Sequence, residues 1–225
     1  MYLAINLREY RTNEEKRKRE VKSKLQQGVS AWPTLEKSSL PCISLLDYYP
    51  SGSDDLTDTD LQIQHLIWDF KASPPFPCNN KEILRRHKKA TMFILPFVVD
   101  IINHYFNDLT KDLILACVPA TSKEVNDRRF CDFTRQLCKR TGMKNGYNHV
   151  RITKDGEATH HYFDDAEPVI YVIDKKFFTG KNVLIFDDNV TTGASIERFK
   201  NKLENAGSHV IGAITIGRTC HHYKD

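Results

Sequence analysis

Residues 183–195, VLIFDDNVTTGAS, gather chemically active side chains in a short, ordered stretch. Four apolar residues lead directly into two adjacent carboxylates, Asp187 and Asp188, and small or hydroxylic residues follow from Thr191 to Ser195. Hydroxyl groups beside an unhindered glycine backbone favour binding of a phosphate. The paired carboxylates cannot bind the same phosphate, because like charges repel. They suit a neighbouring group with two hydroxyls, or a divalent cation.

The elements around this stretch place it where ligands bind. We predict a buried strand that ends at Phe186, a turn over 187–193 and a helix over 194–206, which Gly207 can end in the left-handed conformation. Open parallel sheets bind ligands beyond the carboxyl ends of their strands. The free N–H groups at a helix start favour an anion. A phosphate beside a vicinal diol describes ribose 5-phosphate.

The fold class follows from the rest of the chain. Short, continuous apolar runs at 113–118, 169–173 and 210–216 predict further strands, and 125–140 predicts a helix. Continuous apolar strands that alternate with helices are typical of a parallel sheet covered on both faces. The sequence therefore predicts an α/β fold, a parallel sheet flanked by helices.

The first 80 residues have a less regular pattern, so we divide the chain into an irregular, mainly helical N-terminal extension, 1–80, and an α/β domain, 81–225. Within the extension, Trp32-Pro33 and Leu40-Pro41 mark loops, and TDLQIQHLIWDFK predicts a helix capped by Thr59 or Asp60. Residues 81–106 predict one long helix or a broken pair, because Pro96 removes a hydrogen-bond donor.

The positive charge of the chain is localised. Residues 8–24 hold eight Arg or Lys against four Glu, which equals the formal net charge of +4 for the whole chain. This composition is typical of a solvated helix face, and we favour that interpretation over a nucleic-acid-binding segment.

Cysteine usage and hydropathy predict a cytoplasmic protein. The six cysteines include no CxxC pair, which is typical of reduced thiols and argues against a zinc module. The longest apolar run, 92–99, is interrupted by Pro96 and is too short to cross a bilayer. The N-terminal residues do not form a secretory signal. We therefore expect no membrane partner.

Residues 183–195 resemble the signature with which type I phosphoribosyltransferases bind phosphoribosyl diphosphate (PRPP). The resemblance implies that Asp187 and Asp188 hold the ribose hydroxyls as the catalytic acids. It implies Mg²⁺ as the cofactor, close to both acids but carried largely by diphosphate and ribose oxygens. The 5-phosphate would be bound by the small residues that follow, namely Thr191, Thr192, Gly193, Ala194 and Ser195.

The same family has a second loop that binds diphosphate. The run LILACV is followed by small and hydroxylic residues with a lysine, Ala120, Thr121, Ser122 and Lys123. Backbone N–H groups, Ser122 and Lys123 suit a diphosphate, but an ordinary N-capped turn explains this stretch equally well. Arg128 and Arg129 follow at the start of the helix as additional candidates.

Residues 154–162, KDGEATHHY, could close over such a site. His160 and Tyr162 are candidates for substrate contact, although an exposed hairpin turn is the favoured interpretation.

Two residues of the signature differ from those of related enzymes. Asn189 stands where the family usually has an apolar residue. Thr191 stands where 6-oxopurine enzymes usually have an Asp that acts on the purine N7, so hypoxanthine and guanine are disfavoured.

The layout is most similar to the ComF-type branch of these proteins, through IWDFK at 67–71, DRRF at 127–130 and FFTGKN ahead of the signature. That branch often carries a cysteine zinc module, whereas Cys42 and Cys78 are isolated here, so a role in DNA uptake does not carry over.

The resemblance implies a glycosyltransferase of nucleotide metabolism that moves the phosphoribosyl group of PRPP to an unidentified acceptor and releases diphosphate. Its partners would be PRPP, that acceptor and a second copy of the chain in a homodimer. The alternative is a non-catalytic protein that senses PRPP or a nucleotide, or one that associates with nucleic acid through residues 8–24 in DNA uptake or regulation.

Overall fold

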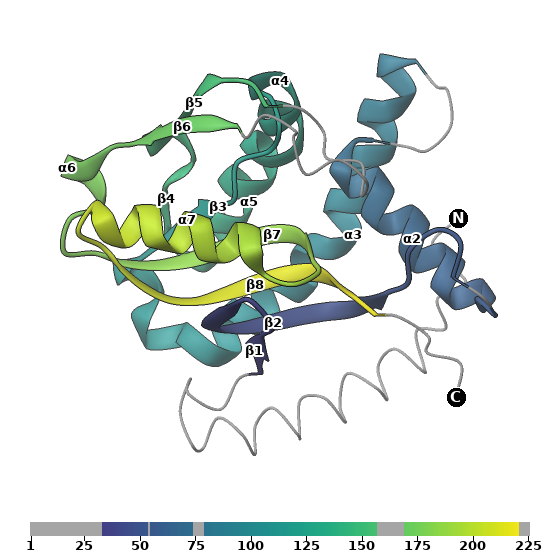
Figure 1. Ribbon diagram of the computed structural model, residues 1–225, viewed down its shortest axis with the longest axis horizontal. Coiled ribbons are helices and arrows are strands. Elements are labelled where there is room, and N and C mark those ends of the chain that lie inside the picture. Colours follow the sequence, from purple (N-terminus) through teal and green to yellow (C-terminus); the bar gives the residue numbers. More distant parts are fainter. Residues whose placement is uncertain (1–32, 54, 74–78, 157–168, 221–225) are drawn as a thin grey trace.

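The computed structural model describes residues 33–53, 55–73, 79–156 and 169–220. Within these ranges a six-stranded sheet lies between helices (Figure 1). Its strand order is β1 (Thr34–Leu35), β2 (Ser38–Tyr48), β8 (His209–Thr219), β7 (Asn182–Val190), β3 (Leu113–Cys117) and β4 (Lys144–Asn145). Neighbouring strands from β2 to β4 are all parallel, and β1 is antiparallel to β2. The predicted α/β fold is therefore confirmed.

Successive side chains of β7 enter two different cores, because neighbouring residues of a strand point to opposite faces. Leu184 and Phe186 pack with α2 (Asp58–Lys71), α3 (Asn80–Phe106) and α5 (Asp132–Thr141). Val183 and Ile185 pack with α7 (Ala194–Asn205) on the other face. Residues 183–186 of β7, which precede the acidic pair, are thus buried on both faces of the sheet, as their continuous apolar run predicts.

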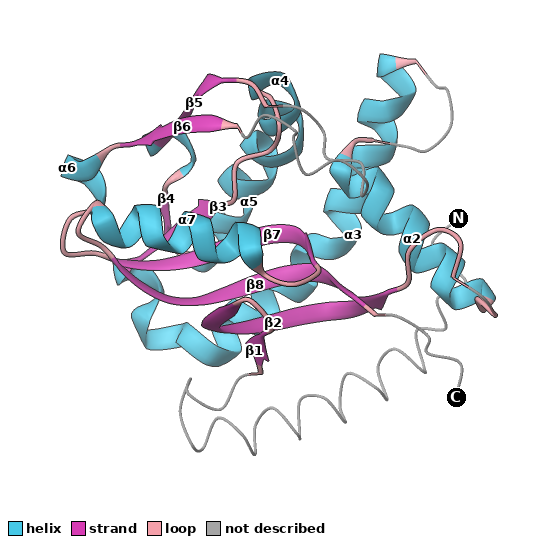
Figure 2. Ribbon diagram, viewed as in Figure 1, coloured by secondary structure: helices cyan, strands magenta, loops and turns pink. Residues whose placement is uncertain are grey.

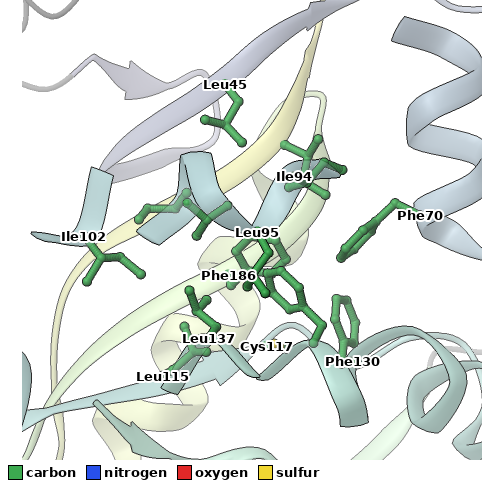
Figure 3. Close-up of a cluster of buried hydrophobic side chains, with 14 of the residues drawn as sticks. Leu45, Phe70, Ile94, Leu95, Ile102, Leu115, Cys117, Phe130, Leu137 and Phe186 are labelled. Atoms are coloured by element: carbon green, nitrogen blue, oxygen red, sulfur yellow. The ribbon is translucent and has the colours of Figure 1, made fainter. Parts of the chain in front are cut away.

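Aromatic rings fix the helices of the first core against β7. Figure 3 shows Phe70 and Phe130 close to Phe186. The ring centroids of Phe70 and Phe130 lie 6.1 Å and 6.3 Å from that of Phe186. All three side chains are fully buried. This contact holds the end of α2 close to the carboxyl end of β7.

The predicted strands at 113–118, 183–186 and 210–216 and the helix at 194–206 correspond to β3, β7, β8 and α7 (Figure 2). The helix predicted over 125–140 consists of α4 (Lys123–Asn126), a π-helical turn η4 (Asp127–Cys131) and α5. Three further short helices lie in the described ranges: η3 (Asn107–Asp112), η5 (Tyr147–His149) and α6 (Lys175–Phe178).

The strand predicted over 169–173 lies outside the main sheet. It is β6 (Ile170–Ile173), which pairs antiparallel with β5 (Val150–Lys154) in a separate two-stranded sheet. Ile170 and Val172 are exposed. An antiparallel pair can leave one face in solvent, so its apolar residues do not require a place in the central sheet.

The region before residue 80 contributes directly to the main fold. The loop predicted at Leu40-Pro41 is wrong: both residues belong to β2, which pairs with β8 along most of its length. Pro41 is tolerated because it precedes Cys42, the first residue of β2 that pairs with β8, and lies opposite the edge strand β1. Residues 38–71 therefore pack with the α/β domain, and the charged segment 8–24 lies outside the described residues.

Two details of the helices complete the description. α2 begins after Thr57, whose side chain accepts a hydrogen bond from the backbone of Asp60 in a capping box, so the cap is neither Thr59 nor Asp60. α3 is one continuous helix through Pro96, which lies on its exposed side, where water can pair with the carbonyl that has lost its donor. Among the described helices, none is both long and apolar enough to span a membrane.

Candidate functional site

The acidic pair lies within a strand and not in a turn. β7 continues to Val190, because β8 extends far enough to pair with it: Asp187 lies opposite Thr215 and Asn189 opposite Gly217. Only residues 191–193 form the turn, and α7 begins at Ala194 as predicted. Because neighbouring residues of a strand point to opposite faces of the sheet, the side chains of Asp187 and Asp188 lie on opposite faces of β7.

A cavity of about 140 Å³ opens at the carboxyl end of β7. It brings together Asp187, Asn189 and all five residues predicted to bind the 5-phosphate; its lining is Asp187, Asn189, Val190, Thr191, Thr192, Gly193, Ala194, Ser195 and Ile196. The cavity includes the first turn of α7, where backbone N–H groups have no partner within the helix. One carboxylate, several hydroxyls and a helix N-terminus thus converge on a space large enough for a small polar group.

The turn beside this cavity is held by the short hairpin between β1 and β2. The backbone N–H of Lys37 donates a hydrogen bond of 2.7 Å to the carbonyl of Thr192. Leu35 packs on Gly193 so closely that an added Cβ would lie 2.7 Å from its side chain. Gly193 also has φ +90°, a conformation that glycine adopts at little cost. Gly193 is therefore required by a contact within the chain, which the sequence did not suggest.

The polar side chains of the cavity are linked to the end of β8. The hydroxyl groups of Thr191 and Thr219 lie 3.0 Å apart. The side-chain amide of Asn189 donates to the same Thr219 hydroxyl at 2.9 Å. Thr219 therefore orients Asn189 and Thr191, although nothing in its sequence context marked Thr219 as a site residue.

Asp188 does not line this cavity. It is 3% exposed and lies on the opposite face of β7, where the guanidinium of Arg129 donates a hydrogen bond to Oδ2. The ammonium of Lys71 lies 3.4 Å from Oδ1. The structure thus brings Arg129, a predicted candidate, to one predicted acid, and adds Lys71, which sequence analysis missed because only its place at the end of an amphipathic helix was visible.

The two carboxyl groups have opposite electrostatic environments. Burial raises the pKa of Asp187, and the neighbouring charge of Asp188 raises it further. Burial also acts to raise the pKa of Asp188, but the charges of Arg129 and Lys71 outweigh it, so the net shift is downward. Asp188 is the charged member of the pair, and Asp187 holds a proton more readily than an ordinary aspartate.

The predicted diphosphate loop lies at the same edge of the sheet. The N–H of Val118 donates to the carbonyl of Phe186, directly before the acidic pair. The Ser122 hydroxyl caps α4 by accepting from the N–H of Val125, and the N–H of Ala120 donates to Asn126. The alternative of an N-capped turn is therefore correct for Ser122. Residues 120–123 are not among those that line the cavity.

The other candidates are placed as follows. The N–H of Lys123 donates to Asp155, and the N–H of Gly156 donates to the carbonyl of Thr121, so the end of β5 approaches this loop. Arg128 forms an ion pair with Glu124 along the helix surface, which is a local helix contact. His160 and Tyr162 lie outside the described residues.

The chain does not supply a complete metal site in the part that the structure describes, since no group of three or more His, Cys, Asp or Glu side chains there could hold an ion. Asp188 is already engaged by two cations, which leaves Asp187 as the carboxylate on the cavity side. A Mg²⁺ ion would therefore need oxygen ligands from a bound molecule, as expected for this kind of ion.

No protein-family model matches the chain, and the curated proteins include no significant match. Several solved structures are similar to it. Adenine phosphoribosyltransferase from Thermoanaerobacter pseudethanolicus is 18% identical, with 65% of this chain and 78% of that chain covered and a TM-score of 0.40. The enzyme from Saccharomyces cerevisiae is 14% identical, with 65% and 79% covered and a TM-score of 0.42. The enzyme from Trypanosoma brucei, in complex with AMP, pyrophosphate and ribose-5-phosphate, is 13% identical, with 78% and 86% covered and a TM-score of 0.38. Similarity at this level leaves the function to be argued from the site itself.

Proposed function

We propose that this protein is a type I phosphoribosyltransferase-like enzyme that binds PRPP and transfers its phosphoribosyl group to an acceptor with release of diphosphate. The observation that carries the proposal is the cavity at the carboxyl end of β7, which joins Asp187 to the loop 191–195. A phosphate at the start of α7 would accept hydrogen bonds from backbone N–H groups and from threonine and serine hydroxyls. Asp187 would then form hydrogen bonds with the ribose hydroxyls beside it, and a carboxyl group can do so in either protonation state.

The proposed reaction requires little covalent chemistry from the protein. Displacement at the anomeric carbon passes through a cationic, oxocarbenium-like state while diphosphate leaves, so positioning and charge stabilisation dominate. Asp187 would orient the ribose, and the loop 191–195 would hold its 5-phosphate. Asp188 does not line the cavity, so its role would be to hold Arg129 and Lys71 in place behind the site. When bound through PRPP oxygens, Mg²⁺ would neutralise part of the charge of the diphosphate.

The acceptor is constrained only in part. Thr191 occupies the place of the acid that 6-oxopurine enzymes use, and its hydroxyl group is directed to Thr219. A threonine cannot perform the proton transfer at the purine N7, so we propose an acceptor other than hypoxanthine or guanine. The ComF-type relationship, the cytoplasmic location and the homodimer stay predictions.

PRPP binding tests the proposal directly. Isothermal titration should detect PRPP binding that is stronger with Mg²⁺, and Asp187→Asn should weaken it by about 2- to 10-fold, the scale for a hydrogen bond between neutral groups, because the pKa of Asp187 is raised. Asp112→Asn, a change at an exposed aspartate after α3, serves as the matched control. Absence of PRPP binding by the folded wild-type protein would exclude the proposed function.

Diphosphate release separates an enzyme from a sensor. The protein should release diphosphate from PRPP with one member of a panel of nucleobases and amines that includes adenine, hypoxanthine and guanine. Asp188→Asn should lower that rate on the order of 10²-fold, the scale for one preorganised electrostatic contact. PRPP binding without release by any acceptor would favour the sensing alternative.

A further inference from the structure

The cavity at the carboxyl end of β7 has no cation of its own. Its lining among the described residues contains no lysine, arginine or histidine, and its one charged side chain type is the carboxyl group of Asp187. Burial raises the pKa of Asp187, so this group opposes an incoming anion less than an ionised aspartate would. A phosphate in this partly enclosed space is favourable only when a positive charge lies close to it.

Arg198 brings a cation to the edge of this cavity. Its Nη2 donates a hydrogen bond of 3.2 Å to the hydroxyl oxygen of Ser195, which lines the cavity. The two residues are three apart on α7, so their side chains lie on one face and the guanidinium group extends toward the N-terminus of the helix. A cation is unfavourable at this end of a helix, where the free N–H groups already carry positive charge. An anion bound at the same place removes this penalty.

The other cations of α7 have partners within the protein. Nζ of Lys200 lies 3.2 Å from a carboxylate oxygen of Glu197. Nζ of Lys202 lies 3.9 Å from the centre of the Tyr171 ring. Arg198, by contrast, forms no ion pair with any residue that the structure describes, and its side chain is exposed. Its charge is therefore available to a ligand.

Lys37 lies beside the same turn but contacts it in a different way. Its backbone N–H donates to the carbonyl of Thr192, and its side chain is exposed. The contact is made by the main chain and not by the ammonium group. Of these two cations beside the loop, Arg198 is therefore the one whose charged group contacts a side chain of the cavity.

The hydroxyl group of Ser195 can connect Arg198 to a bound phosphate. A hydroxyl has one donor and two acceptor positions, so Ser195 can accept from Arg198 and donate to a phosphate oxygen at the same time. A guanidinium group has five N–H donors, and the bond to Ser195 uses one of them. The other donors can bind phosphate oxygens directly, because the planar guanidinium group matches the geometry of a phosphate.

We propose that Arg198 binds the phosphate group held in the cavity and supplies the positive charge that residues 183–195 do not contain, so that the site selects a phosphorylated ribose over an unphosphorylated one. The inference rests on the proposed function and adds to it a residue outside the signature. The loop 191–195 then fixes the position of the phosphate, and Arg198 balances its charge.

Titrations with ribose 5-phosphate, inorganic phosphate and ribose test this assignment. Arg198→Met should weaken binding of both phosphate ligands by about 5- to 10-fold, between the scale of an exposed ion pair and that of a hydrogen bond between charged groups. Ribose, which has no phosphate, should bind the variant and the wild type equally. Arg198→Lys keeps the charge and should have an affinity between these two.

Two control variants remove a positive charge elsewhere. Lys37→Met removes the other cation beside the loop, and Arg140→Met removes an exposed cation on α5. Both should keep an affinity for ribose 5-phosphate close to that of the wild type. A larger loss for Lys37→Met than for Arg198→Met would assign the charge to the hairpin and overturn the inference.

A measurement on the wild-type protein does not depend on any variant. Ribose 5-phosphate should protect Arg198 from a dicarbonyl reagent that modifies arginine, followed by mass spectrometry, and should leave Arg140 reactive. Unprotected Arg198 at saturating ribose 5-phosphate, or unchanged affinity of folded Arg198→Met, would overturn the inference while PRPP binding preserved the proposed function. Absence of PRPP binding by the wild type would instead remove the proposed function, even if inorganic phosphate protected Arg198.

Discussion

Arg129 and Asp188 form a largely buried ion pair that joins a π-helical turn to the end of β7. Lys71 lies against the free side of the same carboxylate, with its Nζ 3.4 Å from Oδ1. Three segments that are distant in sequence therefore meet at one acidic residue of the signature. Asp188, which the sequence predicted to bind a ligand together with Asp187, instead forms ion pairs with Arg129 and Lys71.

Removal of Asp188 should destabilise the fold more than removal of Arg129. Asp188→Asn leaves two cations without a carboxylate, so we expect a loss of about 3–5 kcal/mol in the free energy of unfolding, as for other broken buried ion pairs. Arg129→Met leaves the contact between Lys71 and Asp188, so its loss should be smaller. Urea unfolding of both variants measures the order. The reverse order would show that the contacts of Arg129 with neighbouring backbone matter more than charge balance.

Asp187 should make the stability of the protein depend on pH. Its pKa is raised in the folded state, so the folded protein binds its proton more tightly than the unfolded chain, whose Asp pKa is about 3.9. This contribution is present at low pH and is lost as pH rises through the folded pKa. The free energy of unfolding of the wild type, minus that of Asp187→Asn, should therefore increase as pH falls from about 8 to about 5. A constant difference across that range would contradict the raised pKa, and Asp112→Asn controls for loss of a carboxylate elsewhere.

Gly193→Ala should destabilise the protein, and its cost should be smaller when Leu35 is shortened. Gly193→Ala places a Cβ 2.7 Å from Leu35 and adds the left-handed backbone cost of about 1–2 kcal/mol. Gly180→Ala is a matched control, because Gly180 also has positive φ but has nothing within 4 Å of an added Cβ.

The matching double mutant isolates the clash. Leu35→Ala alone should cost about 2–5 kcal/mol, as for other buried leucines. In combination with Gly193→Ala, the total loss should be smaller than the sum of the single losses by about 0.5–3 kcal/mol. Additive losses in thermal or urea unfolding would mean that the hairpin moves away from Gly193 at no cost.

His87 should add an acid-sensitive contribution to stability. It is buried between the carbonyl of Phe70 and the hydroxyl of Thr91, and burial lowers its pKa, with a further contribution from the charge of Arg129. The stability that it confers is present above the unfolded pKa of about 6.5 and is lost as pH falls through the lowered folded value. His87→Gln should flatten the pH dependence of unfolding in that acidic range, whereas His209→Gln at an exposed position should not. Equal slopes for wild type and His87→Gln would disprove this assignment.

Local pattern was sufficient for much of the fold. The strands at 113–118 and 183–186 consist of continuous apolar residues, and only a strand buried on both faces satisfies such a run in so few residues. Gly207 follows the end of α7 with φ +87°, as its place after the apolar stripe predicted. β2 was missed because Pro41 and several serines suggest a loop, and only its pairing with β8 makes it a strand.

Sequence order also determined the cavity, because residues that follow one another from the end of a strand to the start of a helix must share one turn. Their order along the chain is enough to group Thr191 to Ser195. Tertiary structure alone decided what the two acids do. Because side chains alternate along a strand, Asp187 lies at the cavity and Asp188 lies on the opposite face of β7. α2 and η4 pack on that face and bring Lys71 and Arg129 to Asp188. Contacts between segments so far apart depend on how helices pack across a sheet, which no local spacing of residues specifies.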